Sequence, residues 1–142
     1  MGQNFQNHAK TVPMFHFVVL PILAMNFVWS IVNLVRYFSA GTIRSLLVSF
    51  ALLALAFLAR IFALTVQDRV IRLEMRLRML EILPPDLRVR VPEFTVAQLI
   101  ALRFAGDAEL PALARKVLDE KISDRAAIKK MVQNWQADLL RA

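Results

Sequence analysis

The sequence contains no cysteine and has only three glycines and two histidines among its 142 residues. The absence of cysteine excludes disulfides, thiolate nucleophiles, cysteine-ligated zinc, iron–sulfur clusters and covalently attached c-type haem. Three glycines do not form a glycine-rich phosphate loop. Residues 86–142 also lack histidine and tyrosine, and their carboxylates occupy ordinary helix-start or solvent positions. We therefore expect no enzymatic activity.

Acidic side chains are absent from the first half of the chain, because all 11 of them lie at or after Asp68. The only charged side chains before that point are Lys10, Arg36, Arg44 and Arg60. With 58% hydrophobic residues and a mean hydropathy of +0.51, the chain is too apolar for an ordinary soluble domain. The net charge of +7 thus reflects a membrane-like first half. A nucleic-acid-binding face would gather its basic residues together, so we expect no nucleic-acid partner.

Two hydrophobic runs predict two membrane-spanning helices. Residues 11–35 carry no Lys, Arg, Asp or Glu, which is enough for a first span at residues 13–35. A secretory signal peptide does not fit, because the run is too long and no A-x-A cleavage site follows it. The second span covers roughly residues 43–66, and Arg60 lies near enough to its end to reach the interface. A short outer loop at residues 36–44, with Gly41 as the turn, makes the two spans an antiparallel hairpin.

Basic residues on either side of the spans predict the orientation of the hairpin. The loop carries two arginines, whereas the other side carries Lys10, Arg60, Arg69, Arg72, Arg76 and Arg78. By the positive-inside rule, both termini lie in the cytoplasm.

The second span continues without interruption into a charged helix, since residues 45–80 contain neither proline nor glycine. A helix of this length is roughly 50 Å long, which exceeds the thickness of a bilayer core. Residues 45–83 therefore predict a span that extends as a cytoplasmic stalk. Alternating steps of four and three residues along it meet only small or aliphatic side chains. This predicted seam comprises Ser45, Ser49, Leu52, Ala56, Ala59, Ala63, Val66, Val70, Leu73, Leu77 and Leu80.

Charged residues beside the seam favour a parallel homo-oligomer. Arg69 and Arg76 occupy g positions of the heptad, and Glu74 and Glu81 occupy e positions. A parallel pair of helices places Arg69 opposite Glu74 of the other copy, and Arg76 opposite Glu81. We expect self-association through Ser49, Ala56, Ala63, Val70, Leu77 and these four charged residues.

Two observations leave another interpretation of the stalk open. Asp68 with Arg72, and Glu74 with Arg78, are spaced for ion pairs within one helix, which require no partner. The stalk also has a second apolar stripe, which the C-terminal domain, another subunit or lipid headgroups must cover. This stripe comprises Ile71, Met75, Met79 and Ile82.

After the stalk, the pattern predicts a linker and a small domain of three helices. Pro84 and Pro85 end the stalk, and the linker at residues 84–94 alternates Val and Arg as an extended segment does. The first helix begins at Thr95 with a capping box and ends at Gly106. The second runs from about residue 108 to 121 with a stripe of Leu110, Leu113, Ala114, Val117 and Leu118. The third is capped by Ser123 and carries Ile128, Met131, Val132, Trp135 and Leu139.

Polar residues inside the spans are candidates for function, namely Asn26, Asn33, Arg60 and His16. Asn26 is better placed to bond to another helix than to bind an ion. A neutral His16 imidazole is chemically able to ligate a haem iron or a chlorin magnesium. His16 also lies in the first turn of the span, where the lipid headgroups would engage it. No cofactor or metal is required by the sequence.

Several stretches resemble one family of small bacterial two-span membrane proteins, which is catalogued only as a domain of unknown function. The resemblance is carried by residues 3–8 and 12–16, by the stalk stretches 60–64 and 66–78, by 98–105 and 107–111, and by Ile128-Lys129-Lys130 with Asn134-Trp135. It covers nearly the whole chain. It implies a bacterial source of the acidobacterial kind and hence the inner membrane, and it implies no activity.

The sequence thus predicts an all-α protein with a transmembrane hairpin, a stalk and a small three-helix domain. Its segments are 1–12 (cytoplasmic), 13–35 (first span), 36–44 (loop), 45–83 (second span and stalk), 84–94 (linker) and 95–142 (domain). The function we favour is a non-enzymatic membrane scaffold or accessory subunit that binds lipids, other membrane subunits or itself. The alternative is a cofactor- or pigment-associated subunit of an electron-transfer complex with His16 as a ligand. No small-molecule substrate is identifiable.

Overall fold

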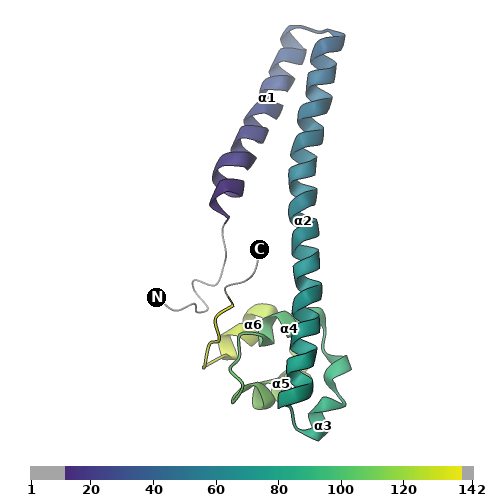
Figure 1. Ribbon diagram of the computed structural model, residues 1–142. Coiled ribbons are helices and arrows are strands. Elements are labelled where there is room, and N and C mark those ends of the chain that lie inside the picture. Colours follow the sequence, from purple (N-terminus) through teal and green to yellow (C-terminus); the bar gives the residue numbers. More distant parts are fainter. Residues whose placement is uncertain (1–11, 139–142) are drawn as a thin grey trace. The chain divides into compact units, whose positions relative to one another are not determined.

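The computed structural model describes residues 12–138, and every regular element among them is helical (Figure 1). The chain divides inside its longest helix, between Leu64 and Thr65, into two compact units. Residues 1–11 of the expected cytoplasmic segment, with Lys10, and residues 139–142 of the expected domain, with Leu139, lie outside the described residues.

The first unit is a helical hairpin. A π-helical turn, η1 (Met14–Val19), leads into α1 (Leu20–Arg36), and α2 (Ala40–Ile82) begins after three residues. Pro21 has no N–H to donate and therefore interrupts the α-helical hydrogen bonding. Just before it, the N–H of Leu20 bonds to the carbonyl of Phe15, five residues back, which is the π-helical pattern. The helices Met14–Arg36 and Ala40–Ile82 are both long and apolar enough to cross a membrane.

The loop is shorter than the sequence indicated, and Gly41 is not its turn. Ser39 and Thr42 exchange bonds, because the N–H of Thr42 donates to the Ser39 hydroxyl and the N–H of Ser39 donates to the Thr42 hydroxyl, at 3.2 and 3.0 Å. This pair satisfies two of the free N–H groups at the start of α2. The helix therefore starts at Ala40, and Gly41 lies in its first turn.

The second unit combines the stalk segment of α2, residues 65–82, with the C-terminal helices. These are α3 (Pro85–Arg88), the 3-10 turn η2 (Val91–Glu93), α4 (Val96–Leu102), α5 (Leu110–Asp119) and α6 (Arg125–Met131). The stalk segment and these helices share one hydrophobic core. All five residues of the stripe predicted for the second helix, Leu110 to Leu118, are buried in α5.

The linker is helical, so the expectation of an extended segment was wrong. Pro84 is extended, but its carbonyl accepts the N–H groups of Leu87 and Arg88 and starts the turn of α3. Leu83, Leu87 and Val91 enter the core at four-residue intervals, whereas an alternating strand would also turn Val89 to the core, and Val89 is 78% exposed. The Arg88 guanidinium also donates to the carbonyl of Leu83 and so caps the end of α2.

The first helix of the domain begins as predicted. Thr95 and Gln98 form a capping box, and Gln98 also donates from Nε2 to the carbonyl of Ile122 at 2.9 Å. The helix ends at Leu102 rather than Gly106, since residues 104–106 bond to the C-terminal segment instead.

The third helix differs more from its prediction. Its cap is Asp124, whose carboxylate accepts the N–H groups of Ala126 and Ala127, and not Ser123. It ends at Met131, so Val132 and Trp135 lie beyond it. Trp135 stacks on Phe104 with ring centroids 4.4 Å apart.

Candidate interaction surface

The stalk segment of α2 has one apolar face that the domain covers. Ile71, Met75, Met79 and Leu83 are only 0 to 5% exposed and belong to the common core. We call these four residues the buried stripe. The sequence left open whether the C-terminal domain, another subunit or lipid headgroups cover this face, and the structure shows that the C-terminal domain covers it. Leu83 is buried there in place of Ile82, which is half-buried.

The opposite face of the same segment is apolar and uncovered. Five side chains are 48 to 61% exposed, and we call them the exposed stripe: Val66, Val70, Leu73, Leu77 and Leu80. At 100° per residue they lie on the side of the helix away from the buried stripe. Charged residues separate them along the sequence, so this part of the helix is not a simple continuation of the apolar span. Exposed aliphatic surface at this spacing is typical of interaction sites, so the exposed stripe is a candidate for one.

Charged side chains of opposite sign line the two edges of the exposed stripe. Arg69 and Arg76 lie along one edge, and Glu74 and Glu81 lie along the other. Among the described residues none of the four forms an ion pair. The Nε atom of Arg76 is buried without a hydrogen-bond partner in that part of the chain.

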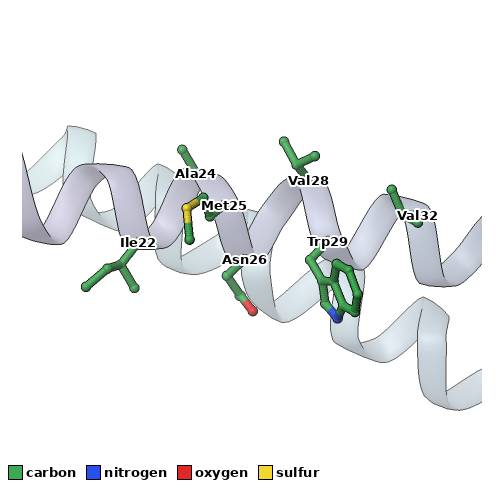
Figure 2. Close-up of a pocket in the computed structure, with 7 residues that line it drawn as sticks. All are labelled: Ile22, Ala24, Met25, Asn26, Val28, Trp29 and Val32. Carbon is green, nitrogen blue, oxygen red and sulfur yellow. The ribbon is translucent and has the colours of Figure 1, made fainter.

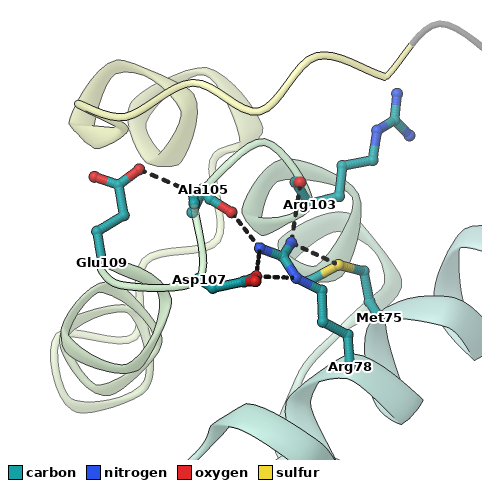
Figure 3. A network of polar contacts seen from close by, with 7 residues as sticks. Met75, Arg78, Arg103, Ala105, Asp107 and Glu109 are labelled. Carbon is teal, nitrogen blue, oxygen red and sulfur yellow. Dashed lines mark hydrogen bonds and ion pairs between the residues drawn. The ribbon is translucent and has the colours of Figure 1, made fainter.

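The ion pair expected within the helix between Glu74 and Arg78 is replaced by a longer-range contact (Figure 3). Arg78 donates from Nε and Nη2 to Asp107 Oδ1, at 2.9 and 2.5 Å. Its Nη2 also donates to the carbonyl of Ala105 at 2.7 Å, and Nη1 donates to that of Arg103 at 3.3 Å. One side chain thus joins the stalk segment to the connection between α4 and α5, on the side of the helix that the domain covers.

A second polar cluster holds the C-terminal segment on that connection. The Glu109 carboxylate accepts N–H groups from Gly106, Gln133 and Asn134, each at 3.1 to 3.2 Å. Gly106 leaves little room for a side chain, since a Cβ atom there would lie 2.7 Å from Nδ2 of Asn134 and 3.3 Å from its backbone carbonyl oxygen. The sequence alone gave no signal that Glu109 joins residues more than twenty positions apart.

Beside the buried stripe lies a cavity of about 350 Å³. It is lined by Ile71, Glu74, Met75, Arg78, Arg103, Gln136, Ala137 and Asp138. Arg103 pairs with Asp138 at 3.1 Å. The charged residues of the lining are two arginines and two carboxylates, so their formal charges cancel, and the rest of the lining is mainly apolar. No serine, threonine or histidine lines it, and the described residues contain no cluster of metal-binding side chains.

Two further ion pairs join the linker to α5 at the surface. Arg115 donates to Asp86 at 2.6 Å, and this hydrogen bond lowers the pKa of the Asp86 carboxyl. Arg90 donates to Asp119 at 2.8 Å, and this bond raises the pKa of the arginine.

Within the hairpin, Ser49 is not available to a partner, contrary to the seam prediction. Its side chain is 1% exposed, and its hydroxyl donates to the carbonyl of Leu46 at 2.9 Å. Ser30 of α1 is also buried, and the rings of Phe27 and Phe50 lie 6.1 Å apart. Small side chains let two helices approach closely, and here they do so inside the hairpin.

Of the other hairpin residues expected to take part in self-association, Ala56 is half-buried and Ala63 is exposed. Arg60 and Asn33 are half-buried, and Asn26 is exposed. The structure therefore does not bring the intramembrane polar candidates into one site.

Asn26 lies in a wide groove along α1 of about 690 Å³ (Figure 2). Figure 2 shows its side chain pointing to the same side of the helix as Ile22 and Trp29. Every residue that lines the groove comes from α1, namely Ile22, Ala24, Met25, Asn26, Val28, Trp29 and Val32. This groove is therefore the outer surface of one helix.

His16 lies half-buried in the π-helical turn. Its Nδ1 is 2.9 Å from the carbonyl oxygen of Val12 and 3.2 Å from the N–H of the same residue. When Nδ1 carries the proton it donates to that carbonyl, and Nε2 is then the nitrogen with a free lone pair.

A comparison with protein-family models matches the chain over residues 1–142 to the "Family of unknown function (DUF6526)". No curated protein matches the chain, and no solved structure does.

Proposed function

We propose, for a chain that belongs over its whole length to this family of unknown function, that it serves as a membrane scaffold or accessory subunit without enzymatic activity. Two helices long and apolar enough to cross a membrane would anchor it. The distribution of arginines then favours both termini in the cytoplasm of a bacterial cell, with the hairpin in the inner membrane. In this arrangement the stalk segment and its helical domain would form the cytoplasmic part.

The exposed stripe is the observation that carries this proposal. Each of its five side chains is about half exposed, although the segment is long and the opposite face is covered by the protein's own domain. Leaving aliphatic surface in water costs roughly 25 cal/mol per Å². A surface of this kind, at heptad spacing and edged with charge, fits the helix of an assembly partner.

Purification from native membranes in a mild detergent tests the proposal, with particle mass and turnover read together. We expect the protein in the membrane fraction, as part of a larger particle. The substitutions Leu73→Gln and Leu77→Gln together should release it from that particle. The matched control is Val89→Gln, an exposed aliphatic residue after α3 that lies outside the exposed stripe. A soluble protein, a monomer under gentle extraction or a purified protein that turns over a substrate would refute the proposal.

A second candidate function rests on the geometry of His16. The contact between Nδ1 and the carbonyl of Val12 would fix the tautomer that leaves Nε2 free, as ligating histidines require. On this view the protein is a cofactor-associated subunit of an electron-transfer complex, with a haem or chlorin metal on His16. A visible absorption band that disappears in His16→Ala would support it, whereas a colourless native preparation would exclude it.

A further inference from the structure

We infer that the partner of the exposed stripe is the exposed stripe of a second copy of this chain, parallel and in register. This inference rests on the proposed function, because the membrane anchor orients the two copies. It goes further by naming the partner and the residues that select it.

The spacing of the exposed stripe is that of a two-stranded coiled coil. Steps of four, three, four and three residues separate Val66, Val70, Leu73, Leu77 and Leu80. Leu73 and Leu80 occupy d positions, and the β-branched Val70 occupies an a position. At Val70, Leu73 and Leu80 this is the combination that favours parallel dimers, whereas Val66 at d and Leu77 at a depart from it.

The charged edges decide the orientation of the second copy. In a parallel pair, Arg69 faces Glu74 of the other copy and Arg76 faces Glu81, and the two-fold axis repeats each pair. In an antiparallel pair, g positions face g positions and e positions face e positions. Arginine would then meet arginine, and glutamate would meet glutamate. The absence of ion pairs at these four residues, among the described part of the chain, is consistent with partners on another copy.

The area of the exposed stripe is too small to hold two free copies together. Five half-exposed aliphatic side chains offer on the order of 250 Å² per copy, or about 500 Å² for the pair. Stable interfaces between free proteins bury at least about 1,200 Å². The exposed stripe therefore selects partner and register, while confinement of both copies to one membrane supplies the effective concentration.

Disulfide cross-linking in native membranes tests the inference on the full chain, because the protein has no cysteine of its own. Single variants Val70→Cys and Leu73→Cys should form homodimers on mild oxidation. Arg72→Cys is the matched control, since Arg72 is exposed but lies at a c position, away from the seam. We expect it to cross-link at least fivefold less.

Charge exchange provides the second measurement. In the Leu73→Cys background, Arg69→Glu with Arg76→Glu should reduce the cross-linked fraction several-fold. Adding Glu74→Arg and Glu81→Arg should restore it, because the pairs are complementary again. Equal cross-linking at residue 72, no response to charge reversal, or a cross-link only to a different protein would overturn the inference. The last of these outcomes would leave the proposed accessory function standing, whereas a soluble protein would remove both.

Discussion

Replacing Arg78 with alanine should detach the domain from the stalk segment. The guanidinium is 20% exposed and is the only described side chain that bonds at once to Asp107 and to the carbonyls of Ala105 and Arg103. A hydrogen bond from a charged donor contributes about 1.5–3 kcal/mol. The Asp107 carboxylate is 68% exposed, so solvent screens its pairing and limits that contribution to about 0–1 kcal/mol. The contact to Arg103 is long at 3.3 Å. We therefore expect a loss of about 2–3 kcal/mol, carried mainly by the bond to Ala105.

Tryptophan fluorescence during urea unfolding measures this loss. The chain has two tryptophans, and Trp29→Phe leaves Trp135, which stacks on Phe104, as the reporter of the domain. At a slope of about 1–3 kcal/mol per molar urea, the Arg78→Ala midpoint should fall by roughly 1–2 M.

Two further variants in the Trp29→Phe background separate the loss of charge from the loss of hydrogen-bond geometry. Arg72→Ala removes an exposed arginine from the same helix and should change the unfolding free energy by less than about 0.5 kcal/mol. Arg78→Lys keeps the charge but loses the planar fork, so it should recover less than half of the loss. If Arg78→Ala unfolds like the parent, or if lysine restores full stability, the reasoning from hydrogen-bond geometry is wrong.

Three other substitutions test the fold at separate points. Gly106→Ala should cost about 1–3 kcal/mol by urea unfolding, because its Cβ would meet Asn134 at 2.7 Å, and adding Asn134→Ala should recover part of that loss. Lys121→Gly should raise the melting temperature by a few degrees, since Lys121 has a φ of 51° that glycine adopts more readily; an unchanged or lower value would contradict this. Asp86→Asn should slightly destabilise the protein at neutral pH by removing the bond from Arg115. The lowered pKa of Asp86 means that this difference persists above its ordinary value of 3.8 and disappears as the pH falls through the folded value, which a pH series of melting curves would show.

The local elements of this protein followed from its sequence. The hairpin helices were predictable because long apolar runs and a helix without proline or glycine need no tertiary information. The capping box of Thr95 and Gln98 and the stripe of α5 were found for the same reason, since their partners lie within one or two turns. Boundaries were wrong where a cap was decided by one residue, as with Asp124 in place of Ser123.

Contacts between residues that are far apart in the sequence could not be predicted from it. Trp135 left its predicted helix because Glu109, more than twenty residues away, holds the N–H groups of the preceding segment. The linker became helical because Leu87 and Val91 follow Leu83 into the core at four-residue spacing while Val89 stays exposed. Ser49 turned inward because α1 packs near it.

By itself, the sequence determined that the stalk segment carries two apolar stripes and that opposite charges edge one of them. It could not determine which stripe the domain would cover, since both consist of aliphatic residues at helical spacing. The tertiary structure decided this: Ile71, Met75 and Met79 join the core of the domain, and Arg78 bonds to Asp107 and the carbonyl of Ala105 instead of to Glu74. A half-buried guanidinium bonds where several acceptors converge, and only the folded chain brings those acceptors together.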